Sequence, residues 1–390
     1  MPELISIFEN MGLNHIGWQE LVMIGVGILF VSLAIKKDIE PYELLPIGLG
    51  IIVGNLPLTG ITLFNPNSDL AQDSGIIGVI FHYGLAHWNI LPPLIFLGLG
   101  AMTDFGPLIS NPKTLLLGAA AQIGIFVAFW AAIMSSLIPG FEGFSIAQSA
   151  VISIIGGADG PTTIFLSGRI SPELLGITAV VAYSYMALVA IIQPPIMKLL
   201  TTKNERLIRM KSPVEISKTK KIVFPMAAML IIILIVPQSA PLIAMFMIGN
   251  IFKESGVVPR LTSTVSNELL NLVTTLLMIT IGAQLAADKI FQFETTLILS
   301  LGLMALILGT AFGVLFAKIM NLFIRDKSNK INPLIGSAGV SAVPMAARIS
   351  HQLGQSEDSD NYLLPHAMAP NVAGVIGSAV VAGIFVSLIN

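Results

Sequence analysis

The sequence predicts an all-α polytopic membrane protein, with about ten transmembrane helices arranged as two inverted repeats. Its composition is the first reason. Of 390 residues, 54% are hydrophobic and only 11% are charged, whereas a soluble domain carries about a quarter charged residues. The second reason is a series of long apolar runs, and the third is a lone carboxylate inside a run that cannot be one continuous helix.

Ten apolar stretches are candidates for membrane crossings. They lie near residues 21–35, 44–63, 91–109, 114–138, 173–197, 222–236, 239–252, 268–287, 296–320 and 363–388. Several are short for a crossing of roughly 20 residues, which is typical of helices packed inside a bundle. The polar stretch 65–74 predicts a loop, and 75–88 predicts an interfacial helix that ends in an aromatic anchor.

Basic residues set the expected orientation. The stretch 198–221 carries eight lysines and arginines, which marks it as a cytoplasmic loop. It divides the chain into a first membrane repeat, 1–197, and a second, inverted repeat, 222–390. If every apolar stretch crosses the membrane, both termini lie outside.

The run GGADGPTTIF contains the only charged residue between positions 143 and 168, Asp159. Its glycines weaken a helix and its proline removes a donor, so the sequence predicts a re-entrant hairpin at about 145–170. A broken backbone at membrane depth is tolerated only against protein or a water-filled cavity. Because a charged side chain there is costly, Asp159 is a candidate functional residue. The alternative is a glycine–proline loop with a solvated aspartate.

A second broken segment is predicted at about 332–350, in NPLIGSAGVSAVPMAAR, entering from the cytoplasmic side. The two halves align at a constant offset of 182 residues, which pairs Gly100 with Gly282, Gly157 with Gly339 and Asp159 with Ser341. Inverted repeats whose broken segments meet at the midplane are typical of a transporter ion site. The alternative is chance similarity between helices rich in glycine and alanine.

The second half offers oxygen donors but no second buried acid. These donors are Asn332, Ser337, Ser341, Asn371 and Ser378. One acid with amide, hydroxyl and backbone oxygens is a hard-ligand set and suits a monovalent cation, sodium first, with a proton left open. For Asn371 and Ser341, hydrogen bonding between helices is the alternative.

Two further residues are candidates. Tyr185 could relay a proton or simply pack, and Arg348 could bind an anionic substrate or extend toward the interface. The chain has no cysteine, which excludes disulfides, thiolate metal sites and a cysteine nucleophile. A net charge of −2 gives no reason to expect a nucleic-acid partner.

Four stretches carry a family resemblance: 92–122, 156–165, 332–348 and 366–379. Through them the chain closely resembles the β subunit of the sodium-pumping biotin-dependent decarboxylases, which include oxaloacetate, methylmalonyl-CoA, glutaconyl-CoA and malonate decarboxylases. The resemblance implies a multi-pass subunit of the cytoplasmic (inner) membrane. Such a subunit takes carboxybiotin from a separate carrier, releases its CO2 and exports sodium, and a proton is taken up from the outer side.

The resemblance also implies roles for individual residues. The sodium site would comprise Asp159, Asn332, Gly336, Ser341 and Asn371. Asp159, Tyr185 and Arg348 would be catalytic, with Arg348 also near the carboxybiotin, which is not covalently bound to this chain.

The implied partners are a small membrane γ-type subunit, a biotin carrier protein and a carboxyltransferase, and a homo-oligomer stays open. A stand-alone sodium-coupled secondary carboxylate transporter is the competing class. A purely structural scaffold would not explain a lone buried acid in a broken helix.

Overall fold

The computed structural model describes residues 12, 15–37, 40–57, 75–211, 214–285, 292–326 and 329–389. Within these ranges every regular element is a helix and there is no strand, which confirms the all-α class. The predicted loop at 65–74 and the end of the predicted stretch 44–63 lie outside the described residues.

The helices follow one another with short connections, and many begin at a proline, whose fixed φ suits the first helical turn. The first half contains α2 (Trp18–Lys37), α3 (Pro41–Gly54), α4 (Ile76–Val79) continued by a π-helical turn (Ile80–His87), α5 (Leu91–Met102), α6 (Gly106–Ser110), α7 (Leu115–Ala121), α8 (Ile123–Ile133), α9 (Ile146–Ile154), α10 (Gly160–Ile170) and α11 (Leu175–Leu200). After α12 (Lys203–Arg206), the second half contains α13 (Lys218–Ile235), α14 (Ala240–Ser255), α15 (Pro259–Thr264), α16 (Leu270–Ala283), α18 (Phe293–Phe323), α19 (Met345–Glu357) and α20 (Leu364–Ile389).

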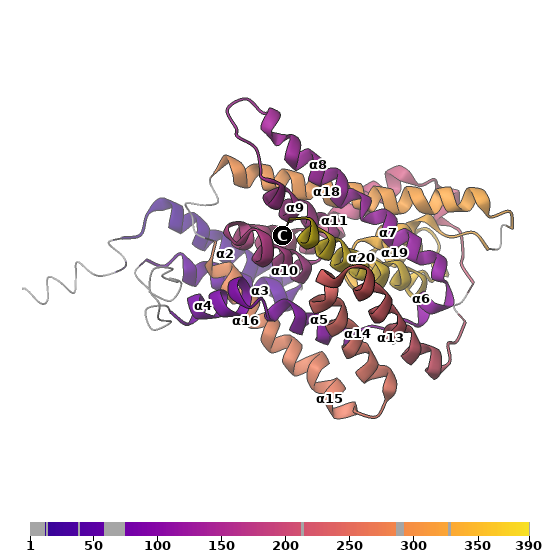
Figure 1. Cartoon of the computed structure of the whole chain (residues 1–390). Helices are drawn as coiled ribbons and strands as arrows, with labels where there is room; N and C mark the ends of the chain where they lie inside the picture. Colours follow the sequence, from indigo (N-terminus) through magenta and orange to yellow (C-terminus); the bar gives the residue numbers. More distant parts are fainter. Residues whose placement is uncertain are drawn as a thin grey trace, which may run out of the picture.

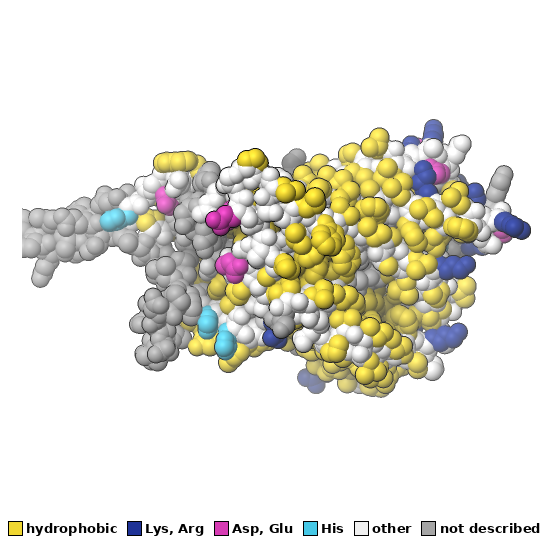
Figure 2. All heavy atoms as spheres, turned by 45° about the horizontal axis from the view of Figure 1, so that its top comes forward, with side chains coloured by type: hydrophobic (Ala, Val, Ile, Leu, Met, Phe, Trp, Pro, Cys, Tyr) yellow, Lys and Arg dark blue, Asp and Glu magenta, His cyan; other side chains and the backbone are white. Residues whose placement is uncertain are grey.

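The surface and the helix lengths are those of a multi-pass membrane protein. Among the described residues, five helices are long and apolar enough to cross a membrane, or up to seven if each of two bent pairs forms one span. Figure 2 shows a broad apolar belt, with most of the visible lysine and arginine side chains gathered at one end of the molecule. The count of ten crossings stays a prediction.

Two pairs of helices from opposite halves cross closely (Figure 1). α5 packs on α14, and α3 packs on α16. Glycines allow both approaches: Gly100 lies against the Phe246 carbonyl of α14, and Gly282 lies against the Ile47 carbonyl of α3. A side chain at either glycine would meet backbone, so these crossings need small residues.

The remaining long helices surround the two broken segments. α18 packs on α7, α8 and α11, and α20 packs on α7, α10 and α19. Their shared interior contains the largest cluster of buried apolar side chains. The broken segments therefore lie in protein and not against lipid, as backbone without helical hydrogen bonds requires.

Each broken segment interrupts its helix where glycine and proline predict. α9 begins at a capping box made by Ser145 and Gln148, and Ala158 adopts a left-handed conformation with φ 51° before α10. In the second half, a 3-10 helix (Pro333–Gly339) ends before Val340, whose backbone is extended. The two breaks meet directly, because the Ser341 amide donates to the Gly157 carbonyl at 2.7 Å.

Candidate functional site: a buried carboxylate and the cavity beside it

Asp159 is held in place by the start of α10. It is the N-cap of that helix, and its Oδ1 accepts a hydrogen bond from the Thr162 amide at 3.1 Å. Aspartate is a favoured cap because its carboxylate satisfies an amide that lacks a helical partner, and the positive end of the helix dipole stabilises the charge. The side chain is only 5% exposed.

Three hydroxyl groups complete the surroundings of this carboxylate. Thr162 Oγ1 and Ser378 Oγ donate to Asp159 Oδ2 at 2.7 and 2.6 Å. Ser341 Oγ donates to Ser378 Oγ at 3.2 Å. We call Asp159, Thr162, Ser341 and Ser378 the Asp159 centre. Within the described ranges no lysine or arginine pairs with Asp159, so its neighbours there are oxygen and amide groups.

Side-chain amides from two helices hold the second broken segment beside this centre. Asn371 Nδ2 donates to the carbonyls of Ala338 and Val340 at 3.0 and 2.8 Å. Gln122 Nε2 reaches the Gly339 carbonyl at 3.4 Å. These contacts satisfy carbonyls that a helix would otherwise have paired, and they position Ser341. The Oδ1 of Asn371 and the Oε1 of Gln122 are buried and have no partner in the described part of the chain.

A cavity of about 390 Å³ leads to the Asp159 centre. Its mouth lies at the start of α3, where Tyr42 is 72% exposed, and its inner wall includes Asp159 and Ser341. The polar groups that line it are Glu40, Tyr42, Glu43, Thr103, Asp159, Tyr183, Ser266, Asn267, Asn271, Thr274 and Ser341. The mouth follows the lysines at the end of α2, and its cytoplasmic orientation stays a prediction from the positive-inside rule.

Arg348 lies near this mouth. It is an exposed residue of α19 and forms no ion pair with the described residues. Burial raises the pKa of Glu40, and the positive charge of Arg348 opposes that rise. The guanidinium is therefore close enough to act on a cavity-lining acid while its own donors stay available.

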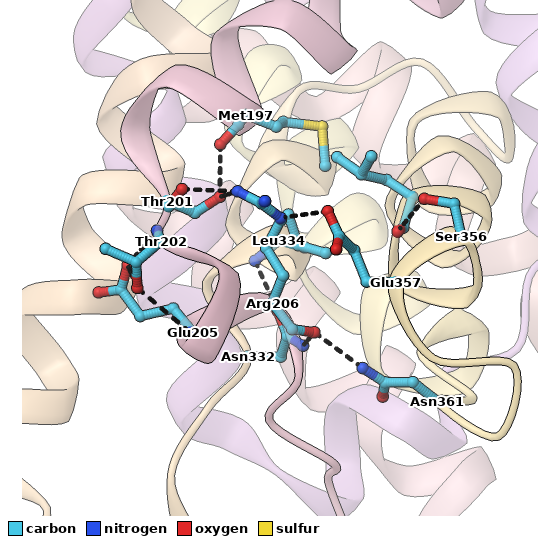
Figure 3. Close-up of polar contacts among 11 residues, drawn as sticks. Met197, Thr201, Thr202, Glu205, Arg206, Asn332, Leu334, Ser356, Glu357 and Asn361 are labelled. Atoms are coloured by element: carbon cyan, nitrogen blue, oxygen red, sulfur yellow. Dashed lines mark hydrogen bonds and ion pairs between the residues drawn. The ribbon is translucent and has the colours of Figure 1, made fainter.

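Asn332 and Gly336 lie in other surroundings. The Asn332 side chain donates to the carbonyls of Arg206 and Ile208, both at 2.8 Å, and accepts from the Leu334 amide. Figure 3 shows it in a polar cluster around Arg206, and none of these hydrogen bonds involves a residue of the Asp159 centre. Gly336 packs its backbone against Gly313 of α18. The role of either residue as a sodium ligand stays a prediction.

Tyr185 also points elsewhere. Its hydroxyl donates to the Leu299 carbonyl of α18, and it is not among the residues that line the cavity.

Sequence reasoning overlooked Thr162, Gln122, Glu43 and Tyr183. Only Thr162 carried a usable signal, because the third residue after a capping aspartate presents its amide to that cap.

Comparison with known proteins identifies the group to which the chain is similar. The family model described as the Na+-transporting oxaloacetate decarboxylase beta subunit matches residues 19–389. The methylmalonyl-CoA decarboxylase subunit beta of Propionigenium modestum is 49% identical over 100% of this chain and 99% of its own length. The glutaconyl-CoA decarboxylase subunit beta of Acidaminococcus fermentans is 48% identical over 99% of this chain and 98% of its own. The oxaloacetate decarboxylase beta chain of Klebsiella pneumoniae is 46% identical over 100% and 99%.

Proposed function

We propose a specific role for this chain in the decarboxylase reaction. The chain belongs to the β-subunit family of the Na+-transporting decarboxylases and is a membrane subunit of such a sodium pump. In our proposal it decarboxylates carboxybiotin presented by a carrier protein and uses that step to export sodium, with proton uptake from the outer side. The observation that carries the proposal is the cavity whose wall includes the buried Asp159 carboxylate, which no described lysine or arginine pairs with. We take its mouth to face the cytoplasm.

Sodium, the transported substrate, would bind at the Asp159 centre. The carboxylate and the hydroxyls of Thr162, Ser341 and Ser378 are oxygen donors, the ligand type that hard cations prefer. A sodium ion there would neutralise a charge that is otherwise costly at membrane depth. Asn371 would act by positioning the segment of Ser341, and direct ligation through its free Oδ1 is compatible with the same geometry.

The carboxybiotin head would enter the same cavity from the cytoplasmic mouth. Arg348 would meet its carboxylate there, because a guanidinium offers paired donors that fit a carboxylate. Much of the deeper wall is apolar, including Leu99, Met186 and Phe246. Moving the carboxylate away from water removes what stabilises the anion and favours loss of CO2.

The inverted repeat fits this arrangement. α5 packs on α14 as α16 packs on α3, and α7 packs on α20 as α18 packs on α11. Gly100 and Gly282 align at the common offset, and they lie at equivalent crossings: Gly100 where α5 meets α14, and Gly282 where α16 meets α3. Under this proposal residues 1–197 and 222–390 are the two repeats, and their broken segments form the ion site between them.

The family indicates a multisubunit complex and not a stand-alone carboxylate carrier. We propose that the partners are a small membrane γ-type subunit, a biotin carrier protein and a carboxyltransferase, assembled at the cytoplasmic membrane. Tyr185 would serve proton or sodium exchange through α18, where its hydroxyl is bound.

The test replaces the buried charge and keeps its shape. In liposomes containing the complete complex, Asp159→Asn should abolish sodium uptake driven by decarboxylation, because the amide cannot neutralise a cation. Asp104→Asn is the matched control, since Asp104 pairs with Lys221 at 3.1 Å outside the cavity. Near-normal sodium transport by Asp159→Asn would refute the assignment.

A further inference from the structure

Tyr183 and Tyr185 project from different faces of α11, since two residues span about 200° of helix. Tyr183 lies over Gly160, so close that a Cβ there would overlap its ring. It is 2% exposed and lines the cavity, and its hydroxyl has no hydrogen-bond partner in the described part of the chain. The tyrosine that faces the Asp159 centre is therefore not the one that the family resemblance singled out.

Glu43 lines the same cavity from α3. Its Oε2 is buried and, among the described residues, has no hydrogen-bond partner. Glu43, Tyr183 and Asp159 all line this one cavity. The Tyr183 hydroxyl therefore shares the cavity with both acids, although it forms a hydrogen bond to neither of them.

Two unpaired polar groups facing one cavity call for a ligand. A buried donor or acceptor left without a partner is destabilising, because it loses its hydrogen bonds to water and gains none in return. Buried carboxylates are normally paired with a cation or carry a proton, yet no lysine, arginine or histidine is among the residues that line this cavity. Unpaired groups of this kind in a native fold are expected where a substrate completes the hydrogen bonds.

Building on the proposed function, we propose that Glu43 and Tyr183 form an acid pair that protonates the biotin ring in the cavity. The bond between the ring nitrogen and the carboxylate carbon breaks, CO2 leaves, and the electron pair stays on nitrogen. The Tyr183 hydroxyl proton moves to that nitrogen, and the Glu43 carboxyl proton reaches the Tyr183 oxygen through cavity water, because the two side chains are not hydrogen-bonded to each other. Glu43 is left as a carboxylate and regains a proton from hydronium that enters from the outer side before the next turnover.

Two substitutions, each of which removes one polar group, test the acid pair. Glu43→Gln and Tyr183→Phe would be assayed in the complete complex in liposomes, by single-turnover release of CO2 from a pre-carboxylated biotin carrier. We expect each to slow release about a hundredfold, the usual size of a general-acid contribution, and to abolish the solvent deuterium effect. The sodium concentration that gives half-maximal rate should stay at its wild-type value.

Matched controls lie on other elements: Glu173 in the 3-10 turn before α11, and Tyr83 in the π-helical turn Ile80–His87. Glu173→Gln and Tyr83→Phe remove the same functions outside this cavity and should keep the wild-type rate. Glu43→Asp keeps an acid and should recover part of the rate with a shifted pH profile. Sodium-dependent protection against protease would show that each variant is folded.

The outcomes separate this proposal from the one it rests on. If the wild-type complex releases no CO2 from carboxybiotin, the proposed function fails. If the wild type is active and Tyr183→Phe and Glu43→Gln match it in rate and isotope effect, the acid pair is wrong and the function stands. A raised sodium requirement at unchanged maximal rate would instead make Glu43 a cation ligand and overturn the proposal.

Discussion

Two polar clusters of the described residues each contain an acid, and they differ in whether a cationic side chain pairs with that acid. In the cluster around Arg206, Glu357 accepts a hydrogen bond from the guanidinium at 2.8 Å, and the Arg206 carbonyl accepts from Asn332 and Asn361 (Figure 3). In the Asp159 centre, the carboxylate receives hydroxyl and amide donors but no cation from the described residues.

Under the proposed function, this difference separates a structural role from a transport role. The Arg206 cluster neutralises its own charges and joins α12, α19 and the start of the second broken segment. The Asp159 centre keeps a charge that only a mobile cation or a proton can neutralise, which is costly inside a membrane unless the charge has a function. Asn332 belongs to the first kind of cluster and Ser341 to the second, although both lie in one broken segment.

The largest effect should come from giving the Asp159 centre a cation of its own. Ser341→Lys places an ammonium in the cavity wall beside the carboxylate. Because a charge pair at about 4 Å is worth roughly 4 kcal/mol in a partly buried site, sodium should be displaced and sodium-dependent decarboxylation should fall about a hundredfold or more. The measurement is 22Na uptake by liposomes that contain the complex.

Ser341→Met is the control for that variant, since methionine has a similar length and no charge. It should retain clearly more sodium uptake than the lysine variant. Equal activity of the two would mean that the missing cation is not what distinguishes the Asp159 centre.

A smaller effect is expected from removing one hydroxyl and leaving the charge. Ser378 donates to Asp159 Oδ2 and accepts from Ser341, so Ser378→Ala interrupts the chain of hydroxyls. Hydrogen bonds to charged groups are worth about 1.5–3 kcal/mol, and we expect the half-saturating sodium concentration to rise about tenfold. Ser350→Ala is the matched control, because the Ser350 hydroxyl bonds Ser337 and the Leu334 carbonyl. A similar shift in both variants would contradict a specific role for Ser378.

The sequence was sufficient for the features that depend on local composition. Low charge predicted the membrane class, and glycine and proline predicted the break at Asp159, where the helix indeed stops and restarts. The constant offset placed Asp159 and Ser341 together, and Ser378 joins them. These signals come from residues that constrain the backbone or carry a charge in an apolar run.

The sequence could not reveal pairings that depend on how distant helices pack. Glu43 is an acid in the first turn of α3, a position that stabilises the helix dipole and needs no further explanation. Only the packing of α3 and α11 around one cavity brings it near Tyr183. Likewise, nothing in the sequence indicated that the Asn332 side chain donates to the carbonyls of Arg206 and Ile208; its role as a sodium ligand stays a prediction.

The smallest effect should come from the self-neutralised cluster, and it should appear in stability and not in sodium affinity. The side chains of Arg206 and Glu357 are 13% and 17% exposed, so their pair is less screened than a surface pair. A double-mutant cycle with Arg206→Gln and Glu357→Gln should give a coupling free energy of about 1–2 kcal/mol. Thermal unfolding in detergent measures it. The comparison that should give less is Arg209 with Asp358, a pair whose arginine is 58% exposed. Half-saturating sodium should stay at the wild-type value in all variants, because the cluster touches no residue of the Asp159 centre. A change in half-saturating sodium as large as that of Ser378→Ala would show that the two clusters are energetically coupled through the second broken segment.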